Sequence, residues 1–283
     1  MASHNLSKLE MGGLEVVGYS VAGEETVIAV PQLDVCFDIG KSPDQLIGIN
    51  NLLLSHGHID HSAGIAYYLS HRKFCGQKPG TVFAPENTIE PIKQILEGFS
   101  KLDGGAVPAK LVGVKPGDEF QIKPNLWARA FETKHSWGSL GFTVIEKKRK
   151  LKEEYLGLAG PKIVALKKKN VEIDYEVQTP LVTYLGDTAY KDYSKLDFVA
   201  NSKILIAECT FIIDEHADRA WAGKHMHVDD FVKMVGQLNN EHVIVAHLSQ
   251  RTFVSEAKKI LRKKLGSEQY EKITLLMDRP KSR

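Results

Sequence analysis

One stretch of the sequence decides the fold: residues 51–64 read NLLLSHGHIDHSAG. A short apolar strand, Asn51–Ser55, runs directly into four potential metal ligands within six positions: His56, His58, Asp60 and His61. Small residues follow and allow a tight turn into a helix. Packing three histidines and an aspartate there for structural reasons alone would be costly, because each brings polar groups that need partners. The stretch therefore predicts a metal site at the end of a buried strand.

The spacing within this cluster indicates two cations rather than one. His56 and His58 stand two apart on an extended backbone, so their imidazoles point the same way and can share one ion. Asp60 and His61 lie at the turn, where they can reach a second ion. Nitrogen and carboxylate ligands without thiolate favour Zn²⁺, with Mn²⁺ or Fe²⁺ as possible substitutes. We therefore expect two Zn²⁺ per chain.

Three further candidate ligands share one context, because each follows an apolar strand: His135 after Leu126–Glu132, Asp187 after Leu181–Leu185, and His247 after His242–Ala246. Taken singly, a histidine after a strand is usually structural, and an aspartate in Gly-Asp-Thr is usually a turn or helix cap. Neighbouring strands, however, deliver their ends to a common rim. Together with the cluster, these residues are interpreted as ligands of the same centre.

Composition fits one globular domain over residues 1–283. The chain is 43% hydrophobic and 25% charged, and strands followed by helices occur twice along it. This pattern predicts two β-sheets packed face to face with helices outside. Apolar runs are too short to span a bilayer and the first ten residues are polar, so we expect a soluble cytoplasmic protein without a membrane partner.

These residues carry a family resemblance. The strand leading into Ser-His-Gly-His-Ile-Asp-His, the three later ligands and the upstream Phe37-Asp38-Ile39-Gly40 resemble the metallo-β-lactamase superfamily over nearly the whole chain. The resemblance implies an αββα sandwich with a dinuclear centre. It implies a first metal on His56, His58 and His135, a second on Asp60, His61 and His247, a bridge through Asp187, and support from Asp38.

Later segments narrow the resemblance. In order, 207–211, 224–227 and 247–251 resemble segments of tRNase Z, the endonuclease that trims the 3′ end of precursor tRNA to leave a 3′-hydroxyl. Residues 15–40 and 152–160 resemble its short form, which implies a homodimer. The resemblance makes Glu208 and His225 a proton-donating couple, and Asp60 joins them as a catalytic residue. Met226-His227 departs from the usual Ser-Thr, so His227 is a rival to His225 as the acid.

The strongest charge block marks a candidate substrate-binding segment. Between Glu146 and Asn170 there are nine basic residues against three acidic ones, although the formal net charge of the chain is only +2. We interpret residues 147–178 as a short arm that binds precursor tRNA. The residues expected to contact substrate are Arg251 and Lys224 for phosphate, and Lys147, Lys148, Lys150, Lys167, Lys168 and Lys169 on the arm.

One alternative stays open because this fold supports several chemistries. A small-substrate metallohydrolase, either a phosphodiesterase for cyclic nucleotides or other diesters or a glyoxalase II-like thioesterase, would use the same centre. Such an enzyme would leave the lysine-rich segment unexplained.

Overall fold

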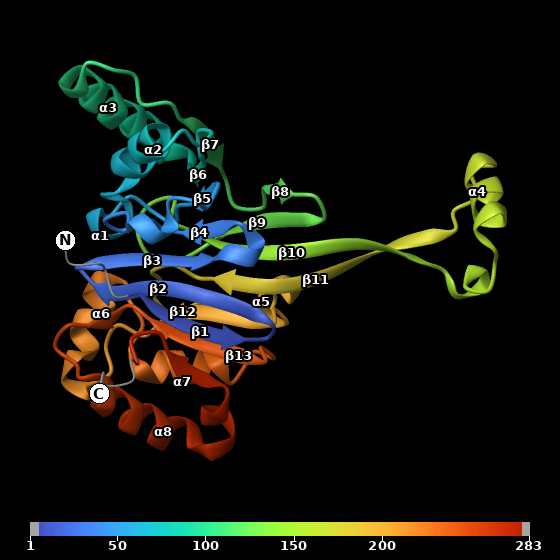
Figure 1. Ribbon diagram of the computed structural model, residues 1–283. Helices are drawn as coiled ribbons and strands as arrows, with labels where there is room; N and C mark the ends of the chain where they lie inside the picture. The colour runs from blue at the N-terminus through green and yellow to red at the C-terminus, as the bar shows by residue number, and fades with distance from the viewer. Residues whose placement is uncertain (1–5, 279–283) are drawn as a thin grey trace, which may run out of the picture.

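A computed structural model describes residues 6–278 and shows two packed sheets with helices on their outer faces (Figure 1). The predicted αββα sandwich is confirmed. The first sheet has the order β1-β2-β3-β4-β5-β6-β7, with β14 beside β2. Its strands are β1 (Ser7–Met11), β2 (Leu14–Ala22), β3 (Glu25–Val30), β4 (Val35–Phe37), β5 (Asn51–Leu53), β6 (Thr81–Pro85), β7 (Lys110–Val114) and β14 (Leu248–Ser249).

The second sheet has the order β15-β13-β12-β11-β10-β9-β8. Its strands are β8 (Glu119–Lys123), β9 (Leu126–Glu132), β10 (Leu140–Leu151), β11 (Asp174–Tyr184), β12 (Ile204–Glu208), β13 (His242–Ala246) and β15 (Ile273–Leu275). Strands β11, β12, β13 and β15 pair in parallel, as do β4, β5, β6 and β7 in the first sheet. Parallel pairing brings the carboxyl ends of these strands to one edge, and that edge holds the candidate ligands.

Apolar side chains form three layers that hold the sandwich together. The central layer lies between the sheets and includes Ile28, Phe37, Leu53, Phe142 and Ile206. Outer layers pack α2 (Ile65–Phe74) and α3 (Glu86–Asp103) on the first sheet, and α5 (Asp197–Ala200), α7 (Val228–Val235) and α8 (Val254–Glu271) on the second. Two further short helices are α1 (Ile59–Ser62) and α6 (Ala217–Gly223). Within residues 6–278, no helix combines the length and the apolar character needed to cross a membrane.

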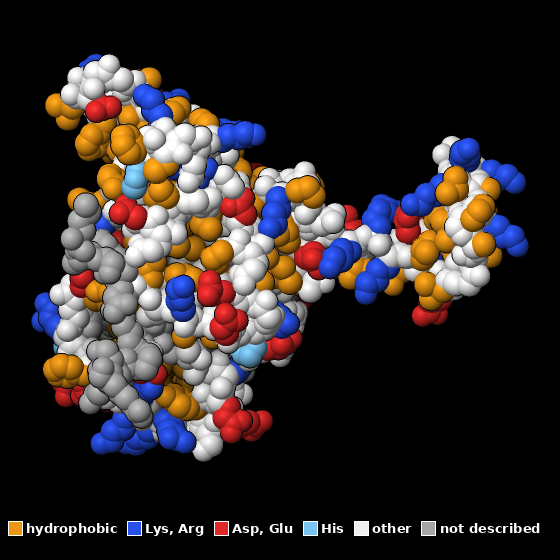
Figure 2. Space-filling view, in the orientation of Figure 1, with side chains coloured by type: hydrophobic (Ala, Val, Ile, Leu, Met, Phe, Trp, Pro, Cys, Tyr) orange, Lys and Arg blue, Asp and Glu red, His pale blue; other side chains and the backbone are white. Residues whose placement is uncertain are grey.

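Strands β10 and β11 continue beyond the sandwich as a two-stranded ribbon that ends in α4 (Gly160–Lys168) (Figure 1). Their pairing extends from Phe142 opposite Tyr184 to Leu151 opposite Asp174. The sequence predicts strands only over 141–145 and 181–185, because the outer halves are charged and lack a buried face. Figure 2 shows lysine and arginine side chains along this ribbon and on its tip. We call residues 146–179 the arm.

Candidate active site

The seven predicted ligands meet at the carboxyl edge of the strands. His56 follows β5, His58 immediately precedes α1, and Asp60 and His61 lie within α1. Residues His135, Asp187 and His247 follow β9, β11 and β13. Their potential ligand atoms form two groups in which all atoms lie within 4.8 Å of one another: His56, His58, His135 and Asp187, and Asp60, His61 and His247. Segments far apart in the sequence thus converge on one place.

Asp187 lies between the two groups. Its Oδ2 is 3.7 Å from His56 Nε2 and 3.8 Å from His135 Nε2, both in the first group. The same oxygen is 3.3 Å from His61 Nε2, and Oδ1 is 3.5 Å from His247 Nδ1, both in the second. Only a carboxylate that reaches both groups can bridge two ions, and Asp187 has this position.

The donor atoms of the cluster fit metal ions better than they fit one another. Nδ1 of His58 faces Nε2 of His135 at 3.1 Å, and the Nε2 atoms of His61 and His247 face each other at 3.4 Å. Nε2 of His56 is buried and has no hydrogen-bond partner within residues 6–278. Buried polar atoms normally have partners. Converging imidazole nitrogens beside carboxylates form the donor set that divalent transition metals prefer.

Protonation states support the same interpretation. Burial, together with the neighbouring histidines, holds the pKa of His56 well below its usual value, so its imidazole is neutral. Burial alone would raise the pKa of Asp187, but His247, His61 and His56 outweigh it and hold that pKa well below its usual range. A neutral imidazole and an ionised carboxylate are the forms that bind metal.

Asp38 orients the cluster from beneath. It is fully buried, and its Oδ1 accepts a hydrogen bond from Ser55 N at 2.7 Å. Its Oδ2 accepts from Ser55 Oγ at 2.8 Å and from Tyr184 Oη at 2.6 Å, and it lies 2.7 Å from His61 Nδ1. Ser55 Oγ is also 2.9 Å from His56 Nδ1. One carboxylate therefore orients the rings of two candidate ligands, His61 directly and His56 through Ser55, with their Nε2 atoms toward the cluster.

The buried Glu208 and the partly buried His225 form a couple beside the cluster. His225 Nδ1 lies 3.0 Å from Glu208 Oε1, which also accepts from Thr188 N at 2.6 Å. The other oxygen, Oε2, accepts from Thr210 Oγ1 at 2.5 Å and from Met226 N at 3.1 Å. Burial disfavours a charged His225, but the Glu208 carboxylate outweighs that effect and raises the pKa of His225 to about 9. The couple therefore holds a proton next to the cluster.

A glycine allows the His225 ring to take this position. A Cβ atom on Gly223 would lie 2.9 Å from His225 Cδ2, which is closer than real Cβ contacts allow. His225 in turn stacks on His247 with ring centroids 5.3 Å apart. The imidazole thus lies between α6 and the candidate ligand His247.

His227, the rival acid, faces another direction. Its Nδ1 accepts from Asp229 N at 3.4 Å at the start of α7, and its Nε2 lies 3.3 Å from the Ile213 carbonyl oxygen. It belongs to a separate group with Asp214 and Asp229. Geometry therefore favours His225 over His227 as the proton donor.

The expected substrate-binding residues are spread over three places. Arg251 lines a hollow of about 680 Å³ together with His58, Asp60, Asp187, His225 and His247. Lys224 ends α6, and its backbone carbonyl lies 3.1 Å from His135 Nδ1, a role that no sequence pattern indicated. The sequence also contained no sign of the supporting roles of Ser55, Tyr184 and Thr210, which contact the candidate ligands, Asp38 or Glu208. The same holds for Gly23, whose N–H donates to Asp60 Oδ2 at 2.8 Å.

The six predicted arm lysines are distant from the metal-binding residues, and they differ in whether they form ion pairs. Lys147 is bound to Glu119, lies 4.6 Å from the Trp127 ring centre and is only 14% exposed. Two others form ion pairs, Lys148 with Glu146 and Lys167 with Asp174. The remaining three have no acidic partner within 4.0 Å among residues 6–278: Lys150, Lys168 and Lys169. These three are the freest to contact a phosphate.

Fold and site together define a metal-dependent hydrolase of the metallo-β-lactamase fold. A family model described as β-lactamase superfamily domain matches residues 30–248. The chain is 34% identical to tRNase Z TRZ1 of Arabidopsis thaliana over 252 residues, which cover 88% of this chain and 90% of that protein. The chain belongs to the tRNase Z family, as its later motifs predicted.

Two further comparisons agree with this membership. A nuclear ribonuclease Z of Triticum aestivum is 35% identical over 166 residues, covering 59% of this chain and 94% of that protein. The crystal structure of the short form of human tRNase Z superposes with a TM-score of 0.59 at 16% identity, covering 83% of this chain and 92% of that one. At that identity the superposition shows the fold alone.

The role of Asp38 can be tested with a matched pair of variants. Asp38→Asn should lower metal affinity about 10- to 100-fold, because an amide group facing Ser55, Tyr184 and His61 sets donor against donor. Asp34→Asn is the control, since Asp34 also has a positive φ and bonds Asn50 rather than a ligand. Competition with a chromophoric chelator measures both. Wild-type affinity in the Asp38→Asn variant would contradict the assignment.

Proposed function

We propose that the protein is a dinuclear-zinc endoribonuclease that removes the 3′ trailer of precursor tRNA and leaves a 3′-hydroxyl. The observation that carries the proposal is the Glu208–His225 couple, placed beside two groups of metal-binding residues in a chain of the tRNase Z family. A small-substrate hydrolase needs neither this couple nor the basic arm. The comparisons therefore favour the nuclease over the alternative.

Each element of the site has a chemical task. When bound, two zinc ions activate water and offset the negative charge of a phosphodiester. Arg251, on the wall of the same hollow, adds a fixed positive charge for the phosphate. Ribose 3′-oxygen is a poor leaving group unless it gains a proton, and His225, held by Glu208 through Nδ1, can give one from Nε2. Asp60 holds the second group of ligands against the β2–β3 turn through Gly23.

The metal count tests the dinuclear part of the proposal. Wild-type protein, purified without chelator and resupplied with zinc, should hold about two zinc ions per chain. Asp187→Ala should lower both occupancy and activity, because Asp187 touches both ligand groups. Asp192→Ala is the control, since Asp192 lies nearby in sequence but, among residues 6–278, its carboxylate accepts hydrogen bonds only from Ser194. Elemental analysis that finds one zinc per chain in the wild-type protein would refute the dinuclear centre.

A role as general acid distinguishes His225 from the metal ligands, because losing the acid should lower turnover without releasing zinc. His225→Ala should keep its zinc and its fold but lose about 10²- to 10⁴-fold in turnover on precursor tRNA. The loss should be smaller on bis(p-nitrophenyl) phosphate, whose leaving group needs little protonation. His227→Asn is the matched control, because asparagine preserves the cap of α7. Equal losses on both substrates, or a larger loss in the control, would remove the acid role from His225.

The arm points away from the cluster of its own chain. Ligand Asp187 follows the inner end of β11, whereas the tip helix α4 lies beyond the outer end of that strand. Eleven residues of β11 at about 3.3 Å each place the tip on the order of 35 Å or more from the cluster. An arm of this geometry suits the active site of a second copy, which supports the homodimer as part of the proposal.

Arm lysines should act through substrate binding. Converting Lys150, Lys168 and Lys169 to Ala should raise the KM for precursor tRNA roughly tenfold or more and reduce its salt dependence, because these cations displace counterions from phosphates. Hydrolysis of bis(p-nitrophenyl) phosphate should stay near wild type. Steady-state assays at several salt concentrations measure both effects.

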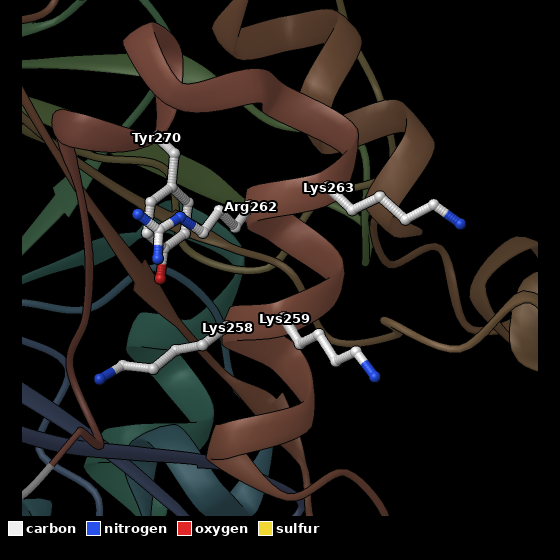
Figure 3. Close-up of a pocket in the computed structure, with 5 residues that line it drawn as sticks. All are labelled: Lys258, Lys259, Arg262, Lys263 and Tyr270. Carbon is white, nitrogen blue, oxygen red and sulfur yellow. The ribbon is translucent and has the colours of Figure 1, made fainter.

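A second basic cluster, away from the arm, gives the control. Lys258, Lys259, Arg262 and Lys263 line a hollow on α8 beside Tyr270 (Figure 3). Lys259→Ala/Lys263→Ala removes exposed charge there and should leave the KM for precursor tRNA much closer to wild type.

Mixing the triple arm variant with His225→Ala chains should restore part of the tRNA cleavage if the arm serves the partner's site. Unchanged salt dependence in the arm variant would show that these lysines are exposed to solvent and do not contact the RNA.

A cytoplasmic location completes the proposal. Because one relative is named a nuclear ribonuclease Z, microscopy of the tagged protein is the direct test.

A further inference from the structure

Two hollows meet at His225. The first holds the metal-binding residues with Arg251 and Phe211, and His225 forms part of its wall. The second, of about 590 Å³, is also lined by His225 and by Lys134, Tyr190, Trp221 and Lys224, among others. A hollow of this size accommodates a small organic group. Nothing in the metal chemistry described above uses it.

An unusually exposed aromatic side chain borders the second hollow. Trp221, in the last turn of α6, is 85% exposed, and within residues 6–278 it has no ring or cation contact. Tyr190 differs, because its hydroxyl donates to Gln237 Oε1 at 3.0 Å and Lys233 covers its ring. A large free indole face beside a nuclease site is suited to stacking on a base, since every base has a π-face.

Charges around the hollow favour a nucleoside with an adjacent phosphate. Lys134 and Lys224 are exposed and have no acidic partner within 4.0 Å in the described part of the chain. The same hollow is also lined by Asp229, which is bound by Lys264 at 2.6 Å, and by Asp230. A phosphate would be repelled by these aspartates and attracted to the lysines.

The direction of the reaction decides which nucleoside this is. Hydrolysis breaks the bond between phosphorus and the 3′-oxygen of the nucleoside on the 5′ side of the scissile phosphate, and His225 gives that oxygen its proton. Proton transfer requires the oxygen within about 3 Å of the imidazole. The phosphate occupies the hollow with the metal ligands, so the ribose of the leaving nucleoside lies at His225, next to the second hollow.

We propose that the second hollow binds the nucleoside on the 5′ side of the cleavage site, with its base stacked on Trp221. The proposal rests on the proposed function, because it uses the direction of phosphodiester cleavage. It makes Trp221 a substrate-binding residue and gives the exposed indole a role that the metal centre does not supply.

The test compares substrates with and without that base. Precursor tRNA is prepared with either the natural nucleoside or an abasic ribose at this position. Trp221→Ala should lower kcat/KM about tenfold on the natural substrate and have little effect on the abasic one. Trp221→Phe should recover much of the activity.

Trp137 provides the control. It is 86% exposed but does not line the second hollow, so any effect of Trp137→Ala should be the same on both substrates. An equal loss on natural and abasic substrates in Trp221→Ala, or no loss on either, would overturn the subsite. Failure of the wild-type protein to cleave precursor tRNA at all would instead overturn the proposed function, so the two failures are distinguishable.

Discussion

The arrangement of the site depends on the hydrogen bonds that the buried Asp38 carboxylate accepts from the protein. A buried carboxylate is costly unless its oxygens receive hydrogen bonds, and Asp38 is completely buried. Its partners come from both sheets, because Ser55 follows β5 in the first and Tyr184 ends β11 in the second. The interaction that orients His61 is therefore also one that fixes the two sheets against each other. Movement of the sheets would expose or unpair this charge, so the fold holds the metal ligands in one arrangement.

Strand direction separates the proposed substrate-binding arm from the candidate metal site. Strand β11 ends just before Asp187 and β10 begins after the loop that holds His135, whereas the arm lies at the outer ends of both strands. Inner residues such as Phe142 and Val182 are buried in the central layer, whereas the outer halves are paired only with each other. The same two strands thus position candidate metal ligands at one end and hold the arm far from them at the other. With this geometry, the arm and the metal cluster of one chain cannot act on the same phosphate.

The convergence of the seven candidate ligands could be predicted from the sequence, because residues suited to metal binding leave a local signal. Histidines clustered directly after an apolar strand rarely have a purely structural role, and strand order brings the distant ligands to the same rim. The supporting contacts have no such signal. In the sequence, Tyr184 cannot be distinguished from a core residue or Thr210 from any other threonine. The contact made by Lys224 uses its backbone carbonyl, which does not depend on the residue type. The outer part of the arm was missed as strand for a related reason, since a ribbon exposed on both faces shows no apolar alternation.

In the proposed mechanism, the Thr210 hydroxyl connects Glu208, which holds the proton donor, to the candidate ligand His247. Thr210 Oγ1 donates its only proton to Glu208 Oε2 at 2.5 Å, so toward His247 Nδ1, 3.0 Å away, it can only accept. His247 must then carry its proton on Nδ1, which leaves the Nε2 lone pair free for a metal ion. Glu208 holds His225 through its other oxygen, Oε1. In the proposed mechanism, one buried carboxylate therefore favours both the protonated form of His225 and the tautomer of His247 that leaves Nε2 free for a metal ion.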